Sequence, residues 1–303
     1  MSQSRPLVPG LARLSNAAVR AIPVMSGLGT YAHSPLGRAV RTGLTPGFVD
    51  IGEGLQLWVD PHEYIGAVIA LCGDFDRRVS AVLTRVIHHG DIVFDIGAHC
   101  GTVAIRAAAH TGPYGVVHAF EPQADLVAML HRSREVNKLE QLHIHEIALS
   151  DSDGEGSLTR SVSPDNLGNR SLIAADPDSD EVVRVASTET WLAEHGIDHV
   201  DVVKIDVEGH ESKVLGGLLA GLKVPPRCIV LESHPRPGKF EDRAEMRILL
   251  DAGYEVFRID RDPLRLLLAR TDVGPPGPPR SIDFVAIPAG APGREVRSAL
   301  GIA

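Results

Sequence analysis

The stretch VFDIGAHCG, residues 93–101, joins a short apolar run to a glycine-rich turn. The apolar run over 92–96 has a glycine on either side, and its β-rich content is typical of a buried parallel strand. An Ala-rich helix is expected over 102–110. Glycine lets a backbone approach a ligand closely, and a helix N-terminus offers free N–H groups. The stretch therefore predicts a strand, a ligand-binding turn and a helix.

The same alternation continues toward the C-terminus. Further strands are expected over 115–120, 142–149, 200–207, 228–231, 254–259 and 282–287. Helices are expected over 124–137, from the end of the fourth strand to about 222, and over 241–252. Strands that alternate with helices of this length form βαβ units, so we predict an α/β fold with a mostly parallel sheet.

The segment before residue 81 has a different character. Residues 1–47 are rich in Gly, Pro, Ser and Arg, which predicts loops with one or two short helices. A hairpin is expected over 48–59, and two helices over 64–88 that are separated at Cys72-Gly73-Asp74. We predict an N-terminal lid or oligomerisation extension over 1–80, a ligand-binding domain over 81–290 and a C-terminal tail over 291–303.

Composition limits the classes of function. The net charge of −9 disfavours general nucleic-acid binding, because phosphate attraction dominates that affinity. The first 49 residues nevertheless contain five arginines and no acid. No run approaches the roughly 18 apolar residues of a membrane-spanning helix. The three cysteines are widely spaced, which argues against a disulfide framework and predicts a cytoplasmic protein.

An acidic residue ends the second expected strand, in Phe120-Glu121-Pro122. An acid about twenty residues after a glycine turn is placed to accept hydrogen bonds from both ribose hydroxyls of an adenosine-type ligand. The turn departs from G-x-G-x-x-G, and Asp95 within it would repel the pyrophosphate of NAD. These features favour S-adenosylmethionine (SAM) over NAD.

Three other polar clusters also follow strands. They are Ala148-Leu149-Ser150-Asp151, residues 204–211 (KIDVEGHE) and residues 231–235 (LESHP). Ligands of open α/β sheets bind outside the carboxyl ends of the strands. We therefore expect all of these clusters to border one crevice.

The motifs VFDIGAHCG, HAFEP, ALSD and KIDVEGHE, in this order, resemble the FkbM-type family of SAM-dependent methyltransferases. The resemblance covers about residues 70–290. It implies a Rossmann-like class I methyltransferase fold, with a seven-stranded, mostly parallel sheet, an antiparallel last strand and helices on both faces. It also implies methyl transfer to a hydroxyl oxygen of natural products or sugars. This chain has His99 where the family commonly has Asn.

The clusters and the resemblance together predict the cofactor site. The residues expected to contact SAM are Asp95, Gly97, His99, Gly101, Thr102, Glu121, Pro122, Ala148, Ser150, Asp151 and Asp206. The acidic insertion over 152–180 and the N-terminal extension, which is expected to be mainly helical, are the expected sources of acceptor specificity. We interpret the insertion as a lid over the acceptor, with a disordered loop as the alternative.

An alcohol acceptor must lose a proton as it attacks the methyl group, so a general base or a metal ion is expected. The predicted catalytic residues are Asp206, Glu208 and His234. A Mg²⁺ site formed by Asp206, Glu232 and His234 is the alternative. The leading hypothesis is a SAM-dependent O-methyltransferase that acts on a small hydroxylated natural product or saccharide. The alternatives are an NAD-dependent oxidoreductase and a non-catalytic SAM-binding relative; a homodimer through the extension is also expected.

Overall fold

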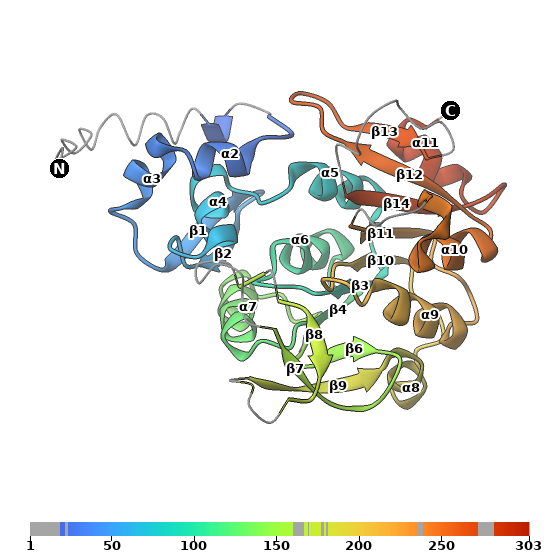
Figure 1. Cartoon of the computed structure of the whole chain (residues 1–303). Coiled ribbons are helices and arrows are strands. Elements are labelled where there is room, and N and C mark those ends of the chain that lie inside the picture. The colour runs from blue at the N-terminus through green and yellow to red at the C-terminus, as the bar shows by residue number, and fades with distance from the viewer. Residues whose placement is uncertain are drawn as a thin grey trace.

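A central sheet of eight strands forms the middle of the molecule, in the order β13-β12-β14-β11-β10-β3-β4-β5 (Figure 1). This computed structural model describes residues 19–21, 24–159, 167–168, 170–176, 179, 181–234, 239–271 and 282–302. The strands are β3 (Ile92–Ile96), β4 (Val116–Phe120), β5 (Leu142–His145), β10 (Val202–Ile205), β11 (Cys228–Glu232), β12 (Tyr254–Asp260), β13 (Leu267–Arg270) and β14 (Asp283–Pro288).

Strand directions confirm the predicted α/β fold. The β3 strand pairs in parallel with β4 and β10, β4 with β5, and β10 with β11. The last strand, β14, lies antiparallel between β11 and β12. The expected count of seven strands is wrong by one, because β13 forms a hairpin with β12 and adds an edge strand. Asp262 begins this turn by accepting hydrogen bonds from the N–H groups of Leu264 and Arg265.

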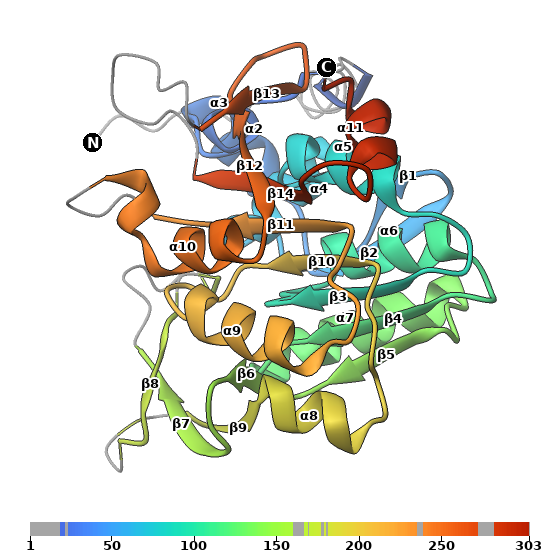
Figure 2. The same cartoon turned by 90° about the vertical axis from the view of Figure 1, so that its right-hand side faces the viewer.

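Helices cover both faces of the sheet (Figure 2). One face carries α5 (Arg77–Val86), α6 (Thr102–Thr111) and α7 (Ala124–Asn137). The other face carries α8 (Thr188–Glu194), α9 (Glu211–Gly221) and α10 (Ala244–Asp251). The 3-10 helix η1 (Phe240–Asp242) precedes α10. Successive strand residues point to opposite faces, so Val93 joins the first core and Phe94 joins the second. Burial on both faces explains the continuous apolar run that predicted this strand.

The single strand expected over 142–149 is wrong. The β5 strand ends at His145, and the chain resumes as β6 (Ala148–Ser150) in a separate four-stranded sheet of order β6-β9-β7-β8. The other members are β7 (Gly154–Leu158), β8 (Leu172–Ala174) and β9 (Val182–Ser187). The described part of the 152–180 insertion therefore contributes two strands, β7 and β8, rather than only loop.

The extension contains the expected hairpin and broken helix pair. The hairpin is β1 (Gly47–Gly52) with β2 (Leu55–Val59), and the helices α4 (Tyr64–Cys72) and α5 are separated by a left-handed Gly73 cap. Two short helices, α2 (Leu28–Ala32) and α3 (Pro35–Arg41), precede them. Residues of β2 and α4 join the same core cluster as the sheet, so this part of the extension packs directly on the domain.

The C-terminal segment carries one helix, α11 (Arg294–Leu300), which buries Val296 and Leu300 in the core cluster that also contains α5 residues. The divisions at residues 80 and 290 stay predictions. Within the described residues, no helix is both long and apolar enough to cross a membrane.

Candidate active site

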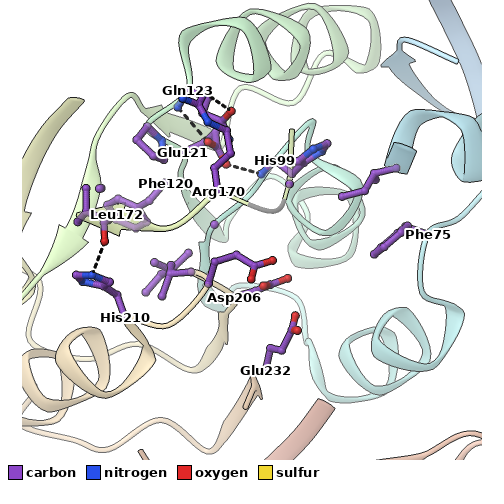
Figure 3. Close-up of a pocket in the computed structure, with 18 of the residues that line it drawn as sticks. Phe75, His99, Phe120, Glu121, Gln123, Arg170, Leu172, Asp206, His210 and Glu232 are labelled. Atoms are coloured by element: carbon purple, nitrogen blue, oxygen red, sulfur yellow. Dashed lines mark hydrogen bonds between the residues drawn. The ribbon is translucent and has the colours of Figure 1, made fainter. Parts of the chain in front are cut away.

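The carboxyl ends of β3, β4, β10 and β11 open onto a cavity of about 370 Å³ (Figure 3). A smaller cavity of about 120 Å³ shares several of its lining residues, among them Gly97, His99 and Asp206. The sequence predicted that the polar clusters after these strands would border one crevice. The structure brings members of all five clusters to the larger cavity.

The glycine turn lies at the centre of the wall. Gly97 has a φ of +78°, and a Cβ added there would lie 1.8 Å from the Asp206 carbonyl oxygen. The backbone N–H groups of Gly97 and Ala98 both donate to the Phe120 carbonyl, at 2.9 and 3.0 Å. Only glycine therefore fits between the ends of β3 and β10, and the turn is held against the end of β4.

Glu121 is buried in the same wall. Its Oε2 accepts a hydrogen bond from the His99 backbone N–H at 2.9 Å, and its Oε1 accepts one from the Gln123 N–H at 3.0 Å. Burial raises the pKa of Glu121 to about 7. Each oxygen retains a second lone pair, so the carboxylate is oriented by the backbone and still able to accept hydrogen bonds from a diol.

Lys204, on β10, links the turn to two carboxylates. Its Nζ donates to the Gly97 carbonyl at 2.6 Å and lies 3.5 Å from both Asp95 Oδ1 and Asp206 Oδ2. Burial by itself would lower the pKa of Lys204, but the two carboxylates outweigh it and raise that pKa. Burial raises the pKa of Asp95. Asp95 lies beneath the turn and lines neither cavity. It therefore supports the turn through Lys204 from behind the cavity wall, and its expected contact with SAM stays a prediction.

Only part of the third cluster lines the cavity. Ala148 lines the cavity, as does Leu149. Ser150 and Asp151 do not line it: Ser150 Oγ lies 3.4 Å from Nδ1 of His210, which does, and Asp151 is exposed beside Lys213. This geometry does not support their expected contact with SAM.

Two further expected contact residues lie at the start of α6. Thr102 lines the smaller cavity, whereas Gly101 caps the helix and lines neither. Gly101 has its own steric role, because a Cβ there would lie 2.1 Å from Leu130 Cδ1. Pro122 lines the larger cavity, as expected.

The expected catalytic groups meet at the β11 side of the cavity. His234 Nε2 lies 2.9 Å from Glu232 Oε1 and 3.4 Å from Glu208 Oε2. The hydrogen bond to Glu232 raises the pKa of His234 to about 9, and burial, reinforced by Asp206, raises the pKa of Glu232. The Glu232–His234 pair therefore holds its shared proton to higher pH than a free histidine does, which differs from the ordinary pKa on which the expected role of His234 as a base rested.

The expected Mg²⁺ site does not fit this arrangement. Within the described residues, no group of three or more His, Cys, Asp and Glu side chains is placed to hold a metal ion. The Asp206 carboxylate lies beside Lys204, and Glu232 is hydrogen-bonded to His234. Both carboxylates already have cationic partners, and Mg²⁺ is not supported here.

Several lining residues were missed because they come from the insertion and the extension, where no site residue was predicted. Gly168, Arg170 and Leu172 of the insertion line the cavity, and Arg170 pairs with Glu181 and donates to Gln123 Oε1 at 3.3 Å. Tyr64 and Phe75 reach it from the extension. The valine-rich sequence of Val182–Ser187 (VVRVAS) was the signal that could have revealed a strand in this region.

Residues 95–256, more than half of the chain, match the family model described as Methyltransferase FkbM domain. The 31-O-demethyl-FK506 methyltransferase FkbM of Streptomyces tacrolimicus is 29% identical over 204 residues, covering 58% of this chain and 76% of that protein. The hexuronic acid methyltransferase AglP of Haloferax volcanii is 24% identical over 199 residues, covering 65% and 78%.

Solved structures are similar at lower identity. A SAM-dependent methyltransferase from Agrobacterium tumefaciens is 11% identical, with a TM-score of 0.46 over 82% of this chain and 71% of that one. A SAM-dependent O-methyltransferase from Thermotoga maritima is 14% identical, with a TM-score of 0.38 over 71% and 65%. The fold itself is shown by the order and direction of the strands in the central sheet.

Proposed function

Because this chain belongs to the FkbM family of methyltransferases, we propose that it transfers the methyl group of SAM to a hydroxyl of a small natural product or saccharide. The observation that carries the proposal is the buried Glu121 beside the Gly97 turn, with Asp206 at the end of the neighbouring strand β10, all lining one cavity. The names of the two curated relatives support an oxygen acceptor and a sugar-like acceptor, respectively.

The cavity walls fit the two halves of SAM. Glu121 suits the ribose diol, and Ala148 and Leu149 provide apolar surface for an adenine. The close approach of the Gly97 turn and the N-terminus of α6 suit the methionine part, beside Thr102. When bound, SAM supplies a methyl group that is already activated by the sulfonium. The protein then mainly has to align the acceptor with it.

Asp206 and the Glu232–His234 pair supply acid-base groups at the acceptor side. Asp206 is oriented by Lys204, so its carboxylate can hold an acceptor hydroxyl by accepting its hydrogen bond. The pair can accept the hydroxyl proton once it has lost its own shared proton. Lys204, itself paired with the buried Asp95, keeps Asp206 in place.

Two alternatives predict a different ligand or no turnover. An NAD-dependent oxidoreductase would bind a nicotinamide cofactor, and a non-catalytic relative would bind SAM without turnover. A screen of hydroxylated acceptors with labelled SAM separates the second from the proposed function. The homodimer through the extension and the cytoplasmic location remain predictions.

Glu121→Ala tests the cofactor site. We expect the affinity for SAM and S-adenosylhomocysteine to fall at least about 100-fold, because the diol donates two hydrogen bonds and charge-assisted hydrogen bonds contribute roughly 1.5–3 kcal/mol each. Isothermal titration calorimetry measures the change, and Asp151→Ala, an exposed carboxylate outside the cavity, is the control that binds as wild type. Since the ionised carboxylate accepts from the diol and its pKa is about 7, wild-type affinity should fall as pH is lowered through 7. Undiminished binding by Glu121→Ala would contradict the proposal.

Glu208→Gln tests the proton-accepting pair. A raised histidine pKa means that the imidazole becomes a base only as pH rises through about 9, so turnover of the wild type should increase over that range. Removing the Glu208 carboxylate, 3.4 Å from His234, should lower the His234 pKa and move the profile to lower pH. The measurement is kcat against pH for both proteins. A profile that stays in place or moves to higher pH would rule out this pair as the base.

A further inference from the structure

Phe75 lies in the short break between α4 and α5, outside the residues that match the family model. Its side chain is 39% exposed and belongs to none of the three core clusters formed by the described residues. It lines both cavities, and among the described residues it is the one Phe, Tyr or Trp that lines the smaller cavity. The fold therefore leaves apolar ring surface uncovered at the site, where burial against a ligand is favourable.

The backbone on either side of Phe75 is held in place. Before it, the buried Asp74 lies 3.3 Å from Arg106 Nη2, and Arg106 also donates to the Gly73 carbonyl at 3.0 Å. Arg106 belongs to α6, the helix that follows the glycine turn of the cofactor site. After the phenylalanine, Asp76 caps α5 by accepting hydrogen bonds from two backbone N–H groups. Because the ring is presented by a fixed backbone, little conformational freedom of this loop is lost when a ligand binds.

The opposite wall of the larger cavity is polar. Figure 3 shows Phe75 across the cavity from Asp206, which follows β10, and Glu232, which ends β11. These carboxylates belong to the groups proposed to hold the acceptor hydroxyl and to take its proton. A molecule between the two walls meets a flat apolar surface on one side and hydrogen-bond acceptors on the other. This combination suits a ring that has an apolar face and a hydroxyl group at its edge.

We propose that Phe75 determines acceptor specificity by stacking against the apolar face of a ring in the acceptor. The inference rests on the proposed function and names the shape of its acceptor, a cyclic molecule rather than an open chain. Stacking fixes the orientation of the ring, which aligns the reacting hydroxyl with Asp206 and the methyl group. An open chain can also contact Phe75, but it loses more conformational freedom in doing so.

The test uses ligand-observed NMR titrations of the protein loaded with S-adenosylhomocysteine. The probes are trans-cyclohexane-1,2-diol and hexane-1,2-diol, which have equal numbers of carbon atoms and hydroxyl groups and differ in the presence of a ring. We expect the wild type to bind the cyclic diol more tightly than the open-chain diol. Phe75→Leu keeps an apolar side chain but loses the flat ring, so it should bind the cyclic diol about fivefold more weakly and the open-chain diol nearly unchanged.

Two further variants serve as controls. Phe75→Tyr keeps the ring and should bind both diols as the wild type does. Tyr114→Ala removes a ring that is 90% exposed and lines neither cavity, so it should also have no effect. Binding of S-adenosylhomocysteine should be unchanged in every variant, which also shows that each one folds.

Three results with the diols would overturn the inference. They are no binding of the cyclic diol by the loaded wild type, equal affinity of the wild type for both diols, and undiminished binding of the cyclic diol by Phe75→Leu. Weaker binding of S-adenosylhomocysteine by Phe75→Leu would also overturn it, because the ring would then contact the cofactor. If the wild type does not bind S-adenosylhomocysteine at all, the proposed function itself fails, and the inference fails with it.

Discussion

Gly97→Ala is expected to destabilise the protein by about 4 kcal/mol and to abolish measurable SAM binding. The added Cβ would lie 1.8 Å from the Asp206 carbonyl oxygen, a backbone atom at the end of the neighbouring strand. Relief requires β3 and β10 to move apart, which separates the turn from Lys204 and Asp206. Denaturant unfolding and calorimetry with S-adenosylhomocysteine measure the two effects.

Gly90→Ala is the matched control for this substitution. Gly90 has a φ of +88°, close to that of Gly97, but a Cβ there meets no atom within 4 Å. The control therefore contains the left-handed strain, roughly 1–2 kcal/mol, without the steric overlap. If the two variants lost equal stability, the close approach at Gly97 would not be the cause.

The grouping of polar residues at the carboxyl ends of the strands was predictable, because it depends only on local sequence and on the parallel arrangement of the strands. Ile92–Ile96 is buried on both faces and reads as a continuous apolar run. Parallel strands place their carboxyl ends at one edge, so the sequence alone is enough to expect Gly97, Glu121 and Asp206 together. The fold class and the wall of the cofactor cavity follow from these features.

The separate sheet and the insertion could not be predicted in this way. Nothing in the sequence of residues 142–150 marks the point where the chain leaves the main sheet, because β5 and β6 are only four and three residues long and apolar residues recur on both sides of the break. The pairing of side chains could not be predicted from the sequence either. The contacts of Glu63 with His99 and of Glu232 with His234 depend on how separate segments pack.

Lys204→Met should cause the second large effect, a loss of about 3–5 kcal/mol of stability at neutral pH, because it leaves the buried Asp95 without its cationic partner. Methionine keeps much of the lysine stem, so packing changes little. The hydrogen bond to the Gly97 carbonyl is also lost, which should weaken cofactor binding. Denaturant unfolding at several pH values measures the stability.

The pH dependence identifies the cause of this loss. Without Lys204, burial holds the pKa of Asp95 further above its unfolded value of about 3.9. A raised carboxyl pKa makes the folded state lose stability as pH rises above the unfolded value, so the variant should be least impaired in acid. Lys213→Met, which removes the exposed partner of Asp151, should change stability by under about 1 kcal/mol at any pH. A Lys204→Met penalty that does not vary with pH would mean that lost packing, rather than an unpaired buried carboxylate, accounts for it.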